Sequence, residues 1–97
     1  MEKRAHKYKI TLEHLATAKG EPGTHEPLQL AFDNHDDIFS IIERMQARNL
    51  FNNDNQSTEF AIGLKMFSEV MLKNRKHPLF EELAPAFSEF MKKLKSM

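Results

Sequence analysis

The residues with the clearest potential for chemistry lie in one stretch, KNRKHPLFEEL, at positions 73–83. Its first half carries three cations and a histidine, and its second half carries two adjacent glutamates. Basic side chains could hold an anion there, together with the free amides at the start of a helix. We therefore take Arg75, Lys76 and His77 as candidate anion-binding residues.

The same stretch is also typical of a boundary between two helices. Lysine and arginine suit the last turn of a helix, where they complement exposed carbonyl groups. Pro78 disfavours a helical His77 and suits the first position of a following helix. The glutamates at 81–82 then lie in the first turns of that helix, near its positive end. This structural interpretation accounts for the whole stretch and competes with the anion site.

Other kinds of chemistry find little support in the sequence. The chain has no cysteine, which excludes disulfides, thiolate metal sites and cysteine nucleophiles. Its five histidines form no recognisable ligand motif, and no serine lies in a nucleophile elbow. No phosphate loop or dinucleotide fingerprint occurs. We predict no catalytic residue, no metal site and no cofactor, and hence a domain that is not an enzyme.

Composition and charge narrow the class of protein further. Basic and acidic residues both number 14, so the net charge is zero with neutral histidines. That balance argues against nucleic acid as a partner, because nucleic acid attracts a summed positive field. There is no apolar run of membrane-spanning length and no signal-peptide core near the N-terminus. We expect a single domain over residues 1–97 in the cytoplasm, with no membrane contact.

The first third of the chain predicts a β-hairpin. Apolar and polar residues alternate in YKITLEHL (8–15) and again in LQLAF (28–32). This is the period of strands that have one face in water. Glycine and proline are frequent over 18–27, which predicts the connecting loop.

The alternation also suggests how the two strands pair. We expect Ile10 opposite Phe32, a register that sets Lys9 beside Asp33 as an opposite-charge pair. A lone two-stranded hairpin has two open edges and is only marginally stable. Either helices protect it, or a second copy of the chain extends the sheet.

The remaining two thirds predict three helices. The first is capped by Asn34 and stops at Asn49. The second begins at Ser57 or Thr58 and is apolar over much of its girth, which predicts a central helix. Gly63 in its interior costs about 1 kcal/mol relative to alanine, so we expect another backbone to approach it closely.

The third helix has the most regular apolar spacing in the chain, alternately three and four residues. This C-terminal seam consists of Phe80, Leu83, Phe87, Phe90 and Leu94. Such a seam packs against another helix, either in the core or in a partner. Pro85 inside it predicts a kink, or two pieces with Pro85 near the start of the second. The predicted fold is α+β: an N-terminal antiparallel β-hairpin followed by three helices, the last kinked near Pro85.

Two strings carry a resemblance to a known family. They are NHDDIFSIIERMQ (34–46) and GLKMFSEVMLKNRKHPLFEELAPAFSEFMKKLK (63–95). The chain resembles a small bacterial family of domains of unknown function, number 3861, from HKYKITLEHL to the final lysines. The resemblance implies a bacterial cytoplasmic protein, and it brings no catalytic residue or ligand to transfer.

Two functions stay open at this point. Three helices carry more apolar surface than one small sheet face covers, which favours a non-enzymatic binding or assembly domain that self-associates as a homodimer. The C-terminal seam is then the candidate interface. The alternative is a domain that binds a small anionic or apolar ligand. Its pocket would lie near the start of the third helix, with Lys76 and His77 at the mouth.

Overall fold

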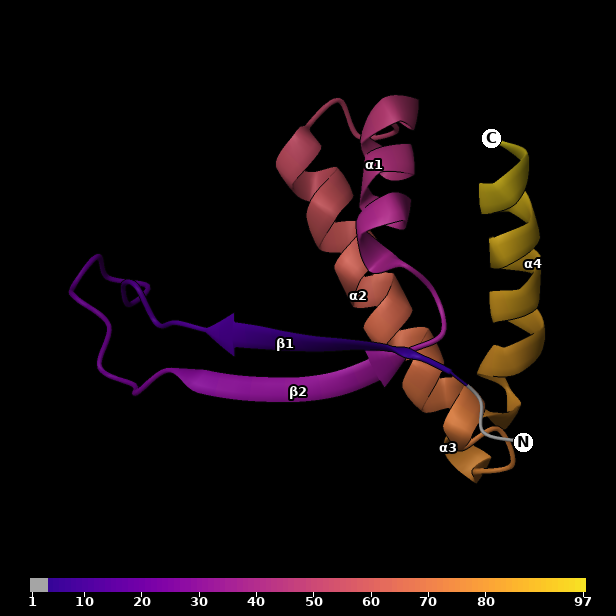
Figure 1. Cartoon of the computed structure of the whole chain (residues 1–97), viewed down its shortest axis with the longest axis horizontal. Helices are drawn as coiled ribbons and strands as arrows, with labels where there is room; N and C mark the ends of the chain where they lie inside the picture. Colours follow the sequence, from indigo (N-terminus) through magenta and orange to yellow (C-terminus); the bar gives the residue numbers. More distant parts are fainter. Residues whose placement is uncertain (1–3) are drawn as a thin grey trace. The chain divides into compact units, whose positions relative to one another are not determined.

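The computed structural model of the chain describes residues 4–97. The chain divides into two units, a hairpin unit that ends at Asp36 and a helical unit that begins at Asp37. Within residues 4–97, two strands come first in the sequence and four helices follow, as the colours of Figure 1 trace. This order confirms the predicted α+β fold with an N-terminal hairpin.

The hairpin unit is built from β1 (His6–Leu12) and β2 (Leu28–Asn34), which pair antiparallel (Figure 1). Side chains on one side of this sheet are apolar, because both strands alternate in the same phase. The opposed apolar pairs are Tyr8–Phe32, Ile10–Leu30 and Leu12–Leu28. We call these six residues the hairpin face.

The expected register of the hairpin is wrong by two residues. Phe32 lies opposite Tyr8 rather than Ile10, and the centroids of the two rings are 5.5 Å apart. The ion pair shifts with it, since Asp33 Oδ2 lies 3.6 Å from Lys7 Nζ and not beside the next lysine. A slip of two residues leaves every side chain on its original face, so alternation alone does not distinguish the two registers.

The loop between the strands is ordered by its own hydrogen bonds. Ala16 and Pro22 form an isolated bridge, and Gly20 between them has a φ of 89°. Glycine adopts this left-handed conformation without steric cost, which allows the tight turn. The Thr24 amide donates to His14 Nδ1 at 3.1 Å. The hairpin therefore continues beyond its regular strands.

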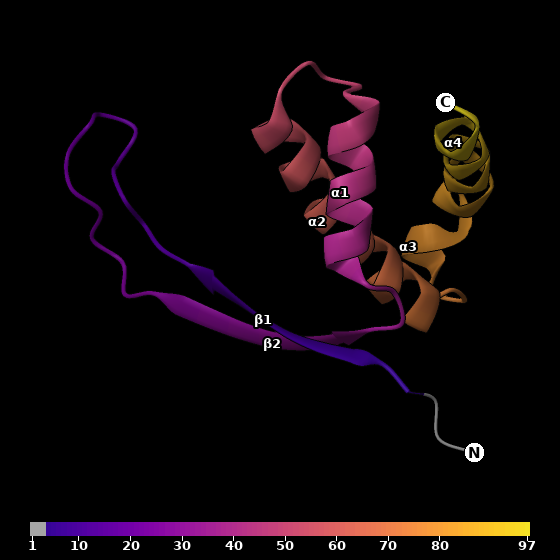
Figure 2. The same cartoon turned by 45° about the horizontal axis from the view of Figure 1, so that its top comes forward.

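The helical unit contains α1 (Ile38–Arg48), α2 (Asp54–Lys73), α3 (Pro78–Glu81) and α4 (Leu83–Ser96). Figure 2 shows α1 beside α2, with α3 leading into α4. Within residues 4–97, no helix combines the length and apolar character needed to cross a membrane.

The predicted helix ends agree with the structure. Asn49 closes α1 with a left-handed φ of 53°, and Pro78 is the first residue of α3. The predicted third helix is divided at Glu82 into α3 and α4. Pro85 is the third residue of α4, where its missing N–H has no intrahelical partner to lose. Of the two predicted outcomes, the structure has the two pieces.

The predicted helix starts are wrong. The N-cap of α1 is Asp37 and not Asn34, and the N-cap of α2 is Asn53 and neither Ser57 nor Thr58. In both helices the cap side chain accepts a hydrogen bond from the amide three residues further on. Several asparagine, aspartate, serine and threonine residues lie near the starts of these helices, and each of them has the chemistry of a cap. Sequence type alone does not choose among them.

The core of the helical unit joins α1, α2 and α4. Its buried members are Met45, Ala61 and Leu94, one from each helix. Ala61 is completely buried, and its small side chain suits the close packing of α1 against α2. A polar contact supports the same pair of helices, because Gln46 Nε2 donates to Thr58 Oγ1 at 2.9 Å.

The helix α4 is joined to α2 by aromatic rings rather than by close approach of the backbones. The α4 backbone stays farther from α2 than the α1 backbone does (Figures 1 and 2). Phe67 of α2 lies 6.2 Å from Phe80 and 5.9 Å from Phe87, measured between ring centroids. The ring centroids of Phe60 and Phe90 are 6.3 Å apart. Edge-to-face rings therefore act as spacers between these helices.

The expected close approach of another backbone to Gly63 is not found. Apart from the adjacent residues and the backbone of α2 itself, no described atom lies within 4 Å of the position that a Cβ would occupy there. The helical propensity lost at this glycine is thus not compensated by packing inside the described chain.

Candidate functional site

The three candidate anion-binding residues lie together in one exposed turn. Arg75 and Lys76 connect α2 to α3, and His77 is the N-cap of α3. His77 Nδ1 accepts the Leu79 amide at 3.0 Å, and the His77 carbonyl accepts the Phe80 amide at 3.0 Å. These amides are therefore engaged within the chain, and α3 is only four residues long. The anion site stays a prediction, with little support from this geometry.

A groove of about 370 Å³ lies near the same turn, between α2 and the α3–α4 segment. We call it the α2–α4 groove. Its apolar lining includes Met71, Leu72, Phe80, Phe87 and Met91. Lys65 and Arg75 also line it, so of the three candidate anion-binding residues only Arg75 reaches this space. The groove has the apolar walls and few charges that small-molecule sites usually combine.

A second groove of about 370 Å³ lies at the other end of the helical unit. It is lined by Leu50, Phe51, Phe60, Phe90, Lys93, Leu94 and Met97. Both grooves follow from the same cause. The phenylalanine pairs hold α4 away from α2, and the space on either side of these pairs is incompletely filled.

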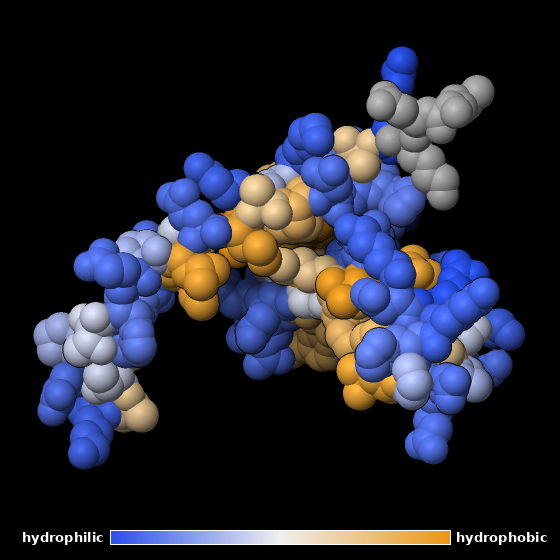
Figure 3. Space-filling model, turned by 90° about the horizontal axis from the view of Figure 1, so that it is seen from below, coloured by the Kyte–Doolittle hydropathy of each residue, from blue (hydrophilic) through white to orange (hydrophobic). Residues whose placement is uncertain are grey.

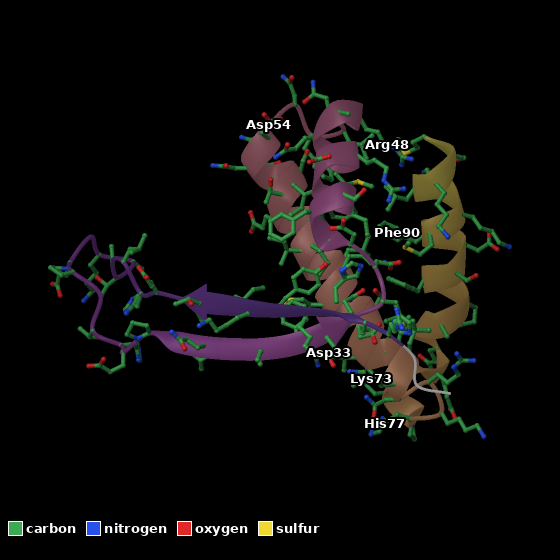
Figure 4. The ribbon with its side chains drawn as sticks, in the orientation of Figure 1. Asp33, Arg48, Asp54, Lys73, His77 and Phe90 are labelled. Atoms are coloured by element: carbon green, nitrogen blue, oxygen red, sulfur yellow. The ribbon has the colours of Figure 1, made fainter. Side chains whose placement is uncertain are left out.

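The C-terminal seam is divided between core and surface. Phe80 and Leu94 are buried, Phe87 is half-buried, and Leu83 and Phe90 are exposed. The seam faces α2, as the labelled Phe90 in Figure 4 illustrates. Its use as an interface with a partner stays a prediction.

The C-terminal end of α4 is held by a hydrogen bond from α1. Arg48 Nη1 donates to the Leu94 carbonyl at 2.8 Å, and Figure 4 shows Arg48 reaching toward that end of α4. A cation at the last carbonyls of a helix complements its negative end. The contact fixes α4 at the position where Leu94 enters the core.

The hairpin face is an apolar surface of the hairpin unit. Its leucines are well exposed, with 66% of Leu12, 58% of Leu28 and 43% of Leu30 accessible. Figure 3 shows hydrophobic residues in orange on the surface along the strands. Alternation in the sequence identified these residues as one face, but no signal in the sequence showed that they would lie open.

The helical unit also exposes large apolar side chains. Half of the eight phenylalanines are exposed, namely Phe39, Phe51, Phe67 and Phe90. Single exposed apolar residues are normal on a protein surface, so these four side chains do not by themselves mark an interaction surface. Among residues 4–97, no three or more histidine, aspartate or glutamate side chains gather as a group able to hold a metal ion.

Comparison with known proteins agrees with the resemblance seen in the sequence. Residues 6–96 match the model of a family described as a domain of unknown function with a solved structure, DUF3861. A crystal structure of a protein of unknown function from Pectobacterium atrosepticum SCRI1043 is similar, with 35% identity and a TM-score of 0.83. That similarity covers 97% of this chain and 100% of the other. No curated protein matches the chain. The chain belongs to the DUF3861 family.

Proposed function

We propose that this domain is a non-enzymatic assembly module of the bacterial cytoplasm that acts as a homodimer, joined through its hairpin unit. One observation carries the proposal. The hairpin face presents six apolar side chains in register, and three of its leucines are exposed. Contiguous apolar surface on a soluble domain is typical of an interaction site.

The size of the sheet supports the same proposal. Both strands are seven residues long, and within residues 4–97 the sheet has two strands. A two-stranded sheet of this kind is marginal alone, whereas three or more strands with an apolar face are stable. A second copy supplies the missing strands.

Charge is compatible with self-association. The chain has no net charge with neutral histidines, so two copies do not repel each other as a whole. The charge pair of Lys7 with Asp33 across the strands is satisfied within one copy. An identical partner therefore needs apolar and backbone complementarity rather than opposite charge.

The test replaces leucines of the hairpin face and measures mass by sedimentation velocity. The Leu28→Lys/Leu30→Lys double variant is expected to sediment as a monomer where the unmodified chain sediments as a dimer. Leu79→Lys is the matched control, because Leu79 is equally apolar and exposed but lies on α3. Helix content, followed by circular dichroism, is expected to stay unchanged in both variants. A double variant that remains dimeric would remove the hairpin from the interface.

The second candidate function is binding of a small apolar ligand with an anionic head. The α2–α4 groove favours it, because apolar walls run beside the two cations Lys65 and Arg75. Decanoate is a suitable probe, and it is expected to raise the melting temperature of the chain. Arg75→Ala reduces that shift, whereas Arg44→Ala on α1, outside the groove, does not. No shift with decanoate, or an equal shift in both variants, would contradict this use of the groove.

A further inference from the structure

We propose that the second copy adds at the outer edge of β2, as an antiparallel strand centred on Ala31. This inference rests on the proposed homodimer and specifies the edge and the register of the pairing. The resulting sheet has four strands in the order β1–β2–β2–β1, related by a two-fold axis beside Ala31.

Both outer edges of the hairpin are candidates at first. Within residues 4–97, neither β1 nor β2 has a further strand beside it. An edge strand of this kind is a template for strand addition unless charge, proline or a bulge protects it. The two edges differ in such protection.

The β1 edge is protected by charge. Its central residue is Lys9, so full-length antiparallel pairing of β1 with its copy places Lys9 directly opposite Lys9. Like charges at opposed positions destabilise a strand pair. Lysine on an edge is also a common device against edge-to-edge association. A second lysine, Lys7, lies two residues away on the same side of the sheet.

The β2 edge has no such protection. Its central residue is Ala31, and its only charged residue is Asp33. Full-length antiparallel pairing places Ala31 opposite Ala31, a pair without bulk or charge. Gln29 then lies opposite Asp33 of the second copy, where the amide can donate to the carboxylate. In this register, β2 is therefore complementary to β2 of the second copy.

The apolar side of the sheet fits the same register. Leu30 lies opposite Phe32 of the second copy, and the two-fold axis repeats this pair. Aromatic and aliphatic side chains at opposed positions stabilise strand pairs. Because residues that oppose each other share a face, the two hairpin faces join into one continuous apolar surface.

The symmetry of the pairing also limits its growth. Pairing β2 of one copy with β1 of another would leave an open edge at each end and lead to filaments. Pairing β2 with β2 uses the same edge twice and closes as a dimer. The outer edges of the four-stranded sheet are then the lysine-bearing β1 strands.

The absence of cysteine from the chain allows a direct test. In an antiparallel pair, opposed Cα atoms are about 4.5–5.5 Å apart, which is within the range that a disulfide spans. The Ala31→Cys variant, oxidised with copper phenanthroline, is expected to give a covalent dimer on a non-reducing gel. Thr11→Cys is the matched control, because Thr11 is an exposed β1 residue on the same side of the sheet as Ala31. We expect Thr11→Cys to cross-link at least about ten-fold more slowly than Ala31→Cys, because of the distance limits of a disulfide.

A second pair of variants tests the register without cross-linking. Ala31→Lys places two lysines opposite each other and is expected to raise the dimer dissociation constant about ten-fold or more. Thr11→Lys is expected to leave the dissociation constant unchanged. Native mass spectrometry of the unmodified chain separates the two ways of failing. A monomer there overturns the homodimer itself. A dimer in which Ala31→Cys cross-links no faster than Thr11→Cys overturns only the β2 edge.

Discussion

The hairpin unit and the helical unit carry equally regular apolar patterns, yet they bury them to different extents. In the helical unit, Met45, Ala61 and Leu94 from three helices form a core. In the hairpin unit, Leu12 and Leu28 oppose each other on the same face and both remain exposed. A regular apolar pattern thus predicts that an apolar face exists, but it does not predict what covers that face. For this chain we propose that a second copy pairs along the β2 edge and extends the hairpin face into a larger apolar surface.

The largest expected effect concerns the buried core of the helical unit. Leu94→Ala is expected to lower the free energy of unfolding by about 2–5 kcal/mol, since Leu94 is buried in the core. Chemical denaturation followed by circular dichroism measures the loss. Leu79→Ala, at an exposed position of α3, is the control and is expected to change stability by about 0.5 kcal/mol or less. Equal losses in both variants would contradict the core described for α4.

A change confined to the hairpin loop tests whether the two units lose order separately. A Cβ at Gly23 would overlap the His14 carbonyl, so Gly23→Ala must displace the loop backbone. We expect a loss of about 1–3 kcal/mol in the local stability of the hairpin. Hydrogen exchange is expected to rise in β1 and β2 and to stay constant in the buried part of α2. Faster exchange throughout α2 would show that the units unfold together.

The start of α2 tests the observed cap against the predicted ones. Asn53→Ala removes the side chain that accepts the Gln56 amide and is expected to cost about 1 kcal/mol. Ser57→Ala serves as the comparison, because the buried Ser57 Oγ has no hydrogen-bond partner among the described residues. Thermal denaturation followed by circular dichroism gives both values. A larger loss at Ser57 than at Asn53 would favour the cap expected from the sequence.

The smallest effect is a gain of stability in the middle of α2. Gly63→Ala is expected to raise the free energy of unfolding by about 0.5–1 kcal/mol, because no described atom crowds the added Cβ. The same denaturation experiment measures it, and the mass of the variant checks the dimer. If the variant instead loses the dimer, Gly63 belongs to an interface and the assignment to the hairpin is incomplete.

Short-range patterns predicted the elements well. Alternation located both strands, Asn49 and Pro78 marked helix boundaries, and Pro85 marked the division of the C-terminal helix. These features depend on neighbouring residues and on the geometry that each residue type allows. The predictions that failed were the strand register, the helix starts and the close approach of another backbone to Gly63. For the register and the helix starts, several arrangements satisfied the same local rule.

The candidate site was harder to predict from the sequence than the helices and strands. The spacing of the C-terminal seam was correct, but its burial depends on how far Phe67 and Phe60 hold α4 from α2. That distance is a property of packing between helices, so neither groove could be predicted from spacing. Arg75 was predicted to bind an anion beside Lys76 and His77, and it lines the groove without them.

Native mass spectrometry of the unmodified chain at low micromolar concentration tests the central claim most directly. It reports the number of subunits and any retained small molecule in one spectrum. We predict twice the 11.3 kDa mass of the chain, with no added mass. A monomer that carries a discrete extra mass would contradict the assembly role and point instead to the α2–α4 groove.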